Sequence, residues 1–296
     1  MNVRLALPAL AAMFWPLTGC GTNPVESGSG PAKLPVAATP VAPPARSPLP
    51  SNPPTGPAGP AMKALQKAAA ASRHALVFLQ AGDDEPTRVA RAKFEAAAAK
   101  LGDRADRVVL DRSAGTDAEL VARYKLTAAP APLVLVVAPN GAVTGGMKAD
   151  EVSSDKLANL LASPAKQTCL KALQDRKLVL LCVQNSSTPA GDAALAGVNA
   201  FKTDARFAAS TEQVTVDPAN ASERDFLAEL QVPPAPPEAV TVFLAPPGVM
   251  LGVFTGATTS STFEVALAKA MSGGCGSGSG CGPGSKGCAP GSAGCR

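Results

Sequence analysis

A long internal repeat constrains the fold of this chain more than any other feature of its sequence. The tetrapeptide KALQ at residues 63–66 recurs at residues 171–174, and each copy leads into a run of apolar residues. Later in each half, Ala-Pro-Asn-Gly at 138–141 is matched by Ala-Pro-Pro-Gly at 245–248. The matches are offset by 106 to 108 residues. This spacing indicates a duplicated domain rather than a short repeat that stacks into a solenoid.

The two halves share one expected order of secondary structure and correspond to domains at 61–163 and 164–271. In each half, apolar runs of strand length alternate with segments of helical periodicity. The order is helix, strand, helix, strand, helix, strand, strand, helix. For the first half the sequence predicts helices at 62–72, 87–101, 116–124 and 154–162, with strands at 75–80, 107–111 and 133–137. Helices at 165–175, about 191–208 and 261–271, with strands at 178–184, 213–217 and 240–244, are their counterparts.

Local signals add detail to this order. Thr116-x-x-Glu119 has the pattern of a capping box at a helix start, and Ser222-x-x-Asp225 opens its counterpart. The first β-α-β unit of each half implies a parallel strand pair, and the turn after residue 139 implies an antiparallel hairpin. We therefore expect an α/β fold in which helices cover both faces of a mixed β-sheet.

This order of elements, at this length, resembles the thioredoxin fold. A sharper match is Tyr124-Lys-Leu-Thr-Ala-Ala-Pro130, which is similar to the thioredoxin segment that leads from an aromatic residue to a cis-proline facing the active site. Residues 230–236 occupy the same place in the second half. The resemblance makes Pro130 and Pro236 the cis-proline candidates, and the adjacent Pro132 and Pro237 leave that choice open by a residue or two. It implies two tandem thioredoxin-like domains.

The loop that carries the redox motif in thioredoxins departs from the family here. Thioredoxins place Cys-Gly-Pro-Cys at the start of the helix after the central strand. The corresponding residues in the first half are Asp84, Glu85, Pro86 and Thr87. In the second half they are Ser187, Thr188, Pro189 and Ala190. The proline is kept in both loops, both sulfurs are missing from both, and Phe78 stands where thioredoxins bury an acid.

These substitutions argue against dithiol chemistry in the two loops. Exchange requires a thiolate at a helix N-terminus and a second thiol that resolves the mixed disulfide. The acidic residues 83–85 are better explained as charges that complement the helix N-terminus, and a two-carboxylate acid/base site is the alternative. The single histidine, His74, excludes a Ser-His-Asp triad in each half and His-rich metal sites.

The N-terminus has the features of an exported bacterial lipoprotein. Arg4 precedes an apolar run at residues 5–17, which is too short to span a bilayer. The run ends in Leu-Thr-Gly-Cys, which resembles a lipobox and makes Cys20 the expected lipidation site after removal of a signal peptide at 1–19. The alternative is an ordinary signal peptide. Residues 20–60 are rich in proline, which predicts an extended tether between the anchor and the folded part.

The remaining cysteines fall into two groups. Cys169 and Cys182 lie on a predicted helix and strand, where we expect buried free thiols, with a disulfide between them as the alternative. Residues 272–296 are rich in Gly and Ser and carry four cysteines: Cys275, Cys281, Cys288 and Cys295. These four are candidates for disulfides or for a soft-metal site that binds copper(I) or zinc, although no cofactor is expected elsewhere.

The combined expectation is a lipid-anchored protein of the bacterial cell envelope that faces the periplasm or the exterior. Its redox-inactive thioredoxin-like domains would bind envelope proteins or extended peptides, with the membrane as a second partner through the lipid anchor. The alternative is a thiol-disulfide oxidoreductase or soft-metal carrier that uses the cysteine tail. A net charge of +4 with no basic cluster argues against nucleic-acid binding.

Overall fold

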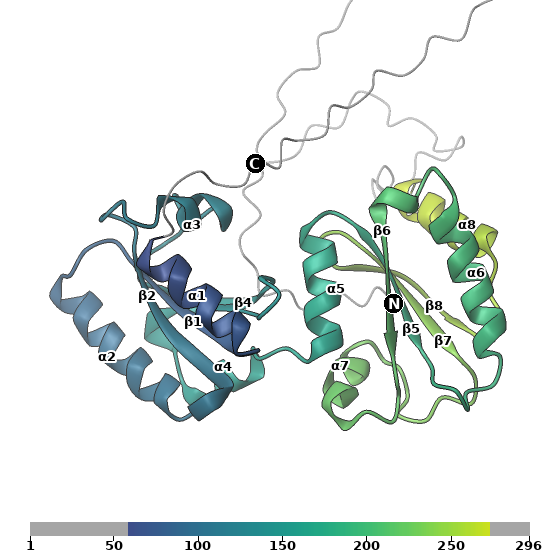
Figure 1. The fold of residues 1–296 in the computed structure, drawn as a ribbon, viewed down its shortest axis with the longest axis horizontal. Helices are drawn as coiled ribbons and strands as arrows, with labels where there is room; N and C mark the ends of the chain where they lie inside the picture. The colour runs from purple at the N-terminus through teal and green to yellow at the C-terminus, as the bar shows by residue number, and fades with distance from the viewer. Residues whose placement is uncertain (1–58, 273–296) are drawn as a thin grey trace, which may run out of the picture.

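The computed structural model describes residues 59–272, and these form two four-stranded mixed sheets with helices on both faces (Figure 1). Within this range no helix has the length and apolar character needed to cross a membrane. The predicted signal peptide at 1–19, Cys20, the four tail cysteines and the tether lie outside the described residues, except for the tether's last two residues, 59 and 60.

The first sheet has the strand order β2-β1-β3-β4. Its central strand β1 pairs in parallel with β2 and antiparallel with β3, and β3 forms a hairpin with β4. The elements, in chain order, are α1 (Pro60–Ala70), β1 (His74–Gln80), α2 (Glu85–Ala99), β2 (Ala105–Asp111), α3 (Ala118–Arg123), β3 (Leu133–Val137), β4 (Val143–Lys148) and α4 (Ser154–Asn159). This is the order and strand direction that the sequence predicted for a thioredoxin-like domain.

The second sheet repeats the plan with the order β6-β5-β7-β8. Its parallel and antiparallel pairs are arranged as in the first sheet. The elements are α5 (Pro164–Gln174), β5 (Leu178–Val183), α6 (Gly191–Thr203), β6 (Thr211–Val216), α7 (Arg224–Glu229), β7 (Val240–Ala245), β8 (Val249–Thr255) and α8 (Ser260–Ser272). Two tandem thioredoxin-like domains are therefore present, as expected.

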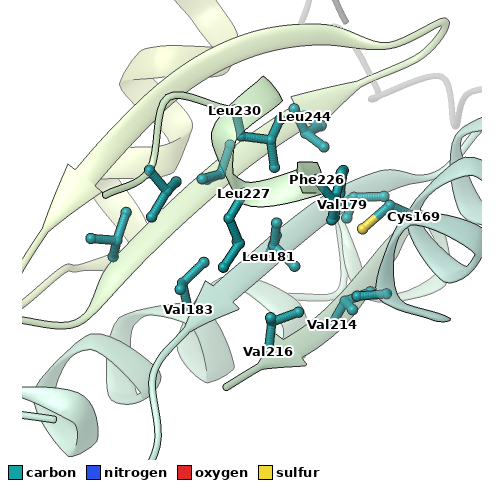
Figure 2. Packing of buried hydrophobic residues seen from close by; sticks show 14 of the residues in the cluster. Cys169, Val179, Leu181, Val183, Val214, Val216, Phe226, Leu227, Leu230 and Leu244 are labelled. Carbon is teal, nitrogen blue, oxygen red and sulfur yellow. The ribbon is translucent and has the colours of Figure 1, made fainter. Parts of the chain in front are cut away.

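Each sheet has two apolar layers, one on each face. In the second domain, α5 and α7 cover one face, where Cys169, Phe226 and Leu227 pack against Leu181 and Val214 of the sheet (Figure 2). The other face is covered by α6 and α8 and is filled by an aromatic cluster of Phe201, Phe243 and Phe263, with ring centroids 5.6 to 5.7 Å apart. The first domain is layered in the same way, with α1 and α3 on one face and α2 and α4 on the other.

The KALQ match is not a structural equivalence. The residue that ends α1 with a left-handed backbone is Ser72, and its counterpart after α5 is Arg176, which is 104 positions later rather than 108. The second KALQ therefore lies one helical turn further along its helix than the first. The repeat correctly indicated a duplication, but this tetrapeptide was an imperfect guide to register because both helices are simply rich in Ala, Leu and Lys.

The two expected capping boxes are also absent. Asp117, not Thr116, precedes α3, and its side chain does not cap that helix. The Asp117 carboxylate instead accepts hydrogen bonds from the backbone N–H groups of Ala61 and Met62 at the start of α1. Glu223 does the same for Ala165 at the start of α5. Neither predicted capping box forms; the residues next to them in the chain, Asp117 and Glu223, cap the first helix of each domain instead.

The domains meet where α5 packs on the hairpin of the first sheet. Leu170 of α5 shares a small apolar cluster with Ala138, Ala142 and Ala162. The side-chain amide of Gln174 donates to the carbonyl of Val143 (2.7 Å) and accepts from its N–H (3.0 Å). Gln174 thereby pairs with the edge strand β4 as a short piece of peptide backbone would.

Candidate functional site

The two loops at the carboxyl ends of the central strands are the candidate sites, because this is where a thioredoxin-like fold places its chemistry. In the first domain the loop runs from the end of β1 to the start of α2. Asp84 is the N-cap of α2, and its carboxylate accepts a hydrogen bond from the N–H of Thr87 (3.0 Å). Pro86 is the second residue of the helix, a position where its missing N–H is harmless. Thr87 is buried beneath the loop.

The carboxylates of this loop do not form an acid/base pair. Asp83, Asp84 and Glu85 are all exposed. Hydrogen bonds from Thr87 lower the pKa of Asp84, so it is a poorer proton donor than an ordinary aspartate near neutral pH. A general acid requires the opposite shift, which burial in an apolar pocket would produce. The geometry supports the charge-complementing role at the helix N-terminus.

A polar network beneath the loop was missed by the sequence analysis. The buried Gln80 ends β1; its amide donates to Asp111 (3.1 Å) and accepts from Arg91, and Arg91 also pairs with Asp83 (3.5 Å). Hydrogen bonds from Ser113 and Gln80 lower the pKa of Asp111. A glutamine at the end of each apolar strand, Gln80 and Gln184, was the available signal. The network fixes the loop in place on the sheet.

The prediction of Pro130 as the cis-proline was wrong by two residues. The cis bond joins Ala131 and Pro132, directly before β3. The family motif counted from Tyr124 ends at Pro130, but two extra residues separate that point from the strand, so the structural position belongs to Pro132. The turn before it is held by Arg112, which donates to the carbonyls of Leu126, Thr127 and Ala129 at 2.7 to 3.1 Å.

The second domain departs further from the prediction. The bonds before Pro236 and Pro237 are not cis; the cis bond joins Pro246 and Pro247 in the β7–β8 hairpin. Nothing in the sequence distinguished these prolines, because all of them lie in Pro-rich turns beside β7. The residue before β7, in the place that Pro132 has before β3, is Ala239.

The loop of the second domain is closed by its own hydrogen bonds. The side chain of Asn185 accepts from Ser187 and Thr188, and it donates to Asp217 (2.9 Å). Ala190 has a left-handed backbone and precedes α6 as its N-cap. Pro189 therefore lies outside the helix and is not equivalent to Pro86, as its matching place in the motif had implied.

The backbone just before β3 differs in its hydrogen bonds from the backbone just before β7, and this difference bears on binding. In the second domain the N–H of Ala239 donates to the carbonyl of Pro189 (3.0 Å), so the loop occupies the edge itself. In the first domain the N–H and carbonyl of Ala131 form no hydrogen bond with any other residue that the structure describes. Ala131 is the first of the two residues that the cis bond joins, and it is only partly buried. Glu238, the counterpart of Ala131, likewise forms no backbone hydrogen bond within the described residues, so the domains differ one residue later: the N–H of Ala239 is taken by Pro189, whereas Pro132 has no N–H.

Cys169 and Cys182 lie away from both loops and are not bonded to each other. Cys169 is on α5 and Cys182 is within β5, with exposed fractions of 2% and 1%. Burial raises the pKa of each thiol to about 12. Both are therefore neutral at physiological pH and packed as small apolar residues rather than as nucleophiles.

A separate cleft of about 660 Å³ lies at the junction of the domains. Its lining includes His74, Arg104, Lys166, Asp225 and Glu229. Lys166 and Glu229 pair within it at 2.7 Å. The Nε2 atom of His74 accepts a hydrogen bond from the N–H of Ala162 (3.2 Å), which ties the interdomain link to the start of β1.

Comparisons with known proteins identify relatives in structure alone. No protein-family model matches the chain, and no curated protein resembles it in sequence. Among solved structures, the first two thioredoxin domains of Saccharomyces cerevisiae Eps1p share 8% identity, with 73% of this chain and 99% of that chain covered at a TM-score of 0.28. Human ERp44 shares 11% identity over 76% of this chain and 59% of that chain, with a TM-score of 0.32.

One further match covers a single domain. The Drosophila melanogaster germline-specific thioredoxin Deadhead shares 20% identity, and the match covers 32% of this chain and 84% of that chain at a TM-score of 0.26. Both domains are thioredoxin-like in the order and directions of their strands.

Proposed function

We propose that this chain is a binding or scaffolding module of the bacterial cell envelope, held at a membrane by lipid on Cys20, and that its first domain grips an extended segment of a partner protein. The observation that carries the proposal is the open backbone edge at Ala131 beside a loop without sulfur. A peptide strand can pair with such an edge through main-chain hydrogen bonds. The polar network under the loop supports a fixed rather than adaptable surface.

The chemistry of the loops supports binding over thiol exchange. Neither loop carries a thiol, and the two cysteines of the described residues are buried with strongly raised pKa values. The β1–α2 loop carries Asp83, Asp84, Glu85 and Arg88, three acidic residues against one basic, so in this proposal it favours a partner segment with basic residues next to its strand-forming part. In the second domain the loop already lies against Ala239 through the carbonyl of Pro189, so that domain serves in this proposal as a support.

Peptide binding can be tested with a matched pair of variants. A library of extended peptides is screened against the full chain, and the tightest binder is measured by calorimetry with the Ala131→Pro variant, which lacks the N–H donor. We expect binding to fall by at least roughly tenfold, the value of one lost hydrogen bond in a dry contact. The equivalent change in the second domain, Glu238→Pro, is the control and should leave affinity unchanged. Equal loss in both variants would reject the assignment to the first domain.

The anchor has its own test. Replacing Cys20 with Ser removes the thiol that carries lipid, so the variant should be released from membranes into the soluble fraction. Continued membrane association of that variant would reject the anchor while leaving the binding proposal intact.

The four evenly placed tail cysteines support a second candidate, a thiol or soft-metal function. Disulfide reductase activity and bound copper or zinc are measured in the full chain and in a chain that ends at residue 272. Activity or metal that disappears with the tail would favour this second function. Activity that persists without the tail would contradict the argument that the loops are inert.

A further inference from the structure

The two sheets have four edge strands, and one of them differs in its chemistry from the other three. β2 carries Asp106 and Arg107, β4 ends in Lys148, and β6 carries Glu212. β8 has the sequence VMLGVFT and no charged residue. Charges on an edge strand oppose pairing with another chain, because pairing would bury or juxtapose them. β8 lacks this protection.

The equivalent edge strand of the first domain, β4, is protected against pairing with another chain. Gln174 covers the backbone of Val143 there, and Thr144 donates to the carbonyl of Leu160 (2.6 Å). Opposite Leu135 and Leu133 of β3, the strand β4 presents Gly146 and Lys148. Along β4, the backbone of Val143 is therefore covered, Gly146 offers no side chain to pack against, and Lys148 is charged.

The matching positions of β8 are uncharged and exposed. Opposite Val242 and Val240 of β7 it presents Val253 and Thr255. The side chains of Val253 and Val249 are 45% and 43% exposed. Apart from pairing with β7, the backbone of β8 receives no hydrogen bond from any other part of the described chain. β8 is the last strand of its sheet (Figure 1).

The composition of the remaining chain argues against the chain's own ends as the occupant. Residues 1–58 contain frequent prolines after the apolar run, and proline cannot donate to a strand ladder. Residues 273–296 are dominated by Gly and Ser, which are poor strand formers. These two segments are therefore poorly suited to add a strand to β8, and a strand from another molecule is the better candidate.

We propose that β8 pairs antiparallel with β8 of a second copy, which joins two sheets into one of eight strands about a twofold axis. The strand is self-complementary, because an uncharged seven-residue segment with Gly252 near its centre meets the same segment without opposing like charges. An isologous contact of this kind closes on itself as a dimer. One strand pair is a small interface, so the dimer is expected to be weak, in the micromolar range or above.

Sedimentation velocity on the full chain tests the dimer, in detergent and in a reducing buffer so that tail cysteines cannot link two molecules. The sample is followed up to about 100 µM, a range suited to a small interface. Val253→Lys should raise the dimer dissociation constant by roughly tenfold or more, since it places two like charges in the strand pair. Val109→Lys is the matched control, because Val109 is 42% exposed on the edge strand β2, and it should have no effect.

A mixing experiment provides the second readout. Equal amounts of Val253→Lys and Val253→Asp should form a mixed dimer that neither variant forms alone, which a general folding defect would not produce. A wild-type chain that stays monomeric across the whole range overturns the proposal, and so does a dimer that both lysine variants weaken equally or that neither affects. Peptide binding at Ala131 lies in the other domain, so its failure is a separate result.

Discussion

Asp117 and Glu223 are equivalent residues of the two domains, and each caps a helix that begins more than fifty residues before it in the chain. The Oδ1 atom of Asp117 accepts from the N–H groups of Ala61 (3.0 Å) and Met62 (3.1 Å). Glu223 accepts from the N–H of Ala165 (3.0 Å) and from the hydroxyl of Ser163. Both carboxylates are buried, with exposed fractions of 5% and 3%. The first turn of the first helix in each domain is thus held by a carboxylate that lies more than fifty residues later in the chain.

Replacing Asp117 with Ala should therefore destabilise the first domain. Two backbone N–H groups lose their acceptor in a buried site, and each unsatisfied donor costs about 1–3 kcal/mol. We expect the free energy of unfolding to fall by about 2–4 kcal/mol in urea denaturation. Asp103→Ala, which removes a fully exposed carboxylate, is the control and should change stability by less than about 0.5 kcal/mol. Equal effects would contradict the capping role.

His74 predicts a stability that falls with acidity. Burial, with the nearby Arg104 as a second cause, lowers the pKa of His74 below its usual 6.5. The unfolded chain therefore binds a proton more readily than the folded one, and stability is full above about pH 6.5 and declines below it. Protonation of Nε2 would also remove the acceptor for the N–H of Ala162.

The measurement is urea denaturation at pH 7.5 and pH 5.5 for wild type and His74→Gln. The glutamine can still accept a hydrogen bond but does not titrate, so the loss on acidification should be smaller in the variant. The charged residues Arg104, Lys166, Asp225 and Glu229 line the same cleft and are present in both proteins. An identical pH dependence in the two proteins would assign the effect to carboxylates instead.

The buried thiols should be unreactive in the folded chain. Cys169 and Cys182 have pKa values raised to about 12 by burial, so almost no thiolate forms at pH 8. We expect iodoacetamide to leave both unmodified in native buffer and to modify both in guanidinium, as read by peptide mass spectrometry. Modification of Cys182 within minutes in native buffer would show an opening of β5 that the packing does not suggest.

Gly197 should resist substitution. A Cβ at this position of α6 would lie 2.3 to 2.5 Å from the backbone and hydroxyl of Thr258, which is closer than any real contact. Gly197→Ala is therefore expected to lower stability by about 1–3 kcal/mol, because backbone must shift to make room. Gly191→Ala, in the same helix, meets only Gln184 at 3.5 Å and should be neutral within about 0.5 kcal/mol. Thermal unfolding of the two variants compares them directly.

The sequence predicted the order of elements because that order depends on local periodicity. The strands β3 and β5 are apolar throughout, β1 is apolar between its terminal His74 and Gln80, and β7 is apolar except for Thr241. Long-range features were the ones that failed. The capping boxes expected at Thr116 and Ser222 did not form, and the neighbouring carboxylates Asp117 and Glu223 cap α1 and α5 instead, which no local pattern indicates.

In the candidate site, too, local features could be predicted from the sequence and long-range features could not. The positions of Asp84 and Pro86 at the start of α2 were predictable, since N-cap and first-turn preferences are local. The network of Gln80, Arg91 and Asp111 was not, because it joins three elements that only the sheet brings together. The cis bond at Pro132 was missed for a related reason: several prolines lay within one loop, and the strand start that selects among them is set by pairing with β1.

The amide of Gln174 has a consequence for how the two halves depend on one another. It imitates a peptide unit and finishes a ladder that the first domain cannot complete by itself. In an isolated N-terminal half, the backbone of Val143 in the edge strand β4 would lose these two hydrogen bonds. We expect such a fragment to aggregate more readily than the full chain. The second domain therefore protects an edge strand of the first, whatever other role either domain has.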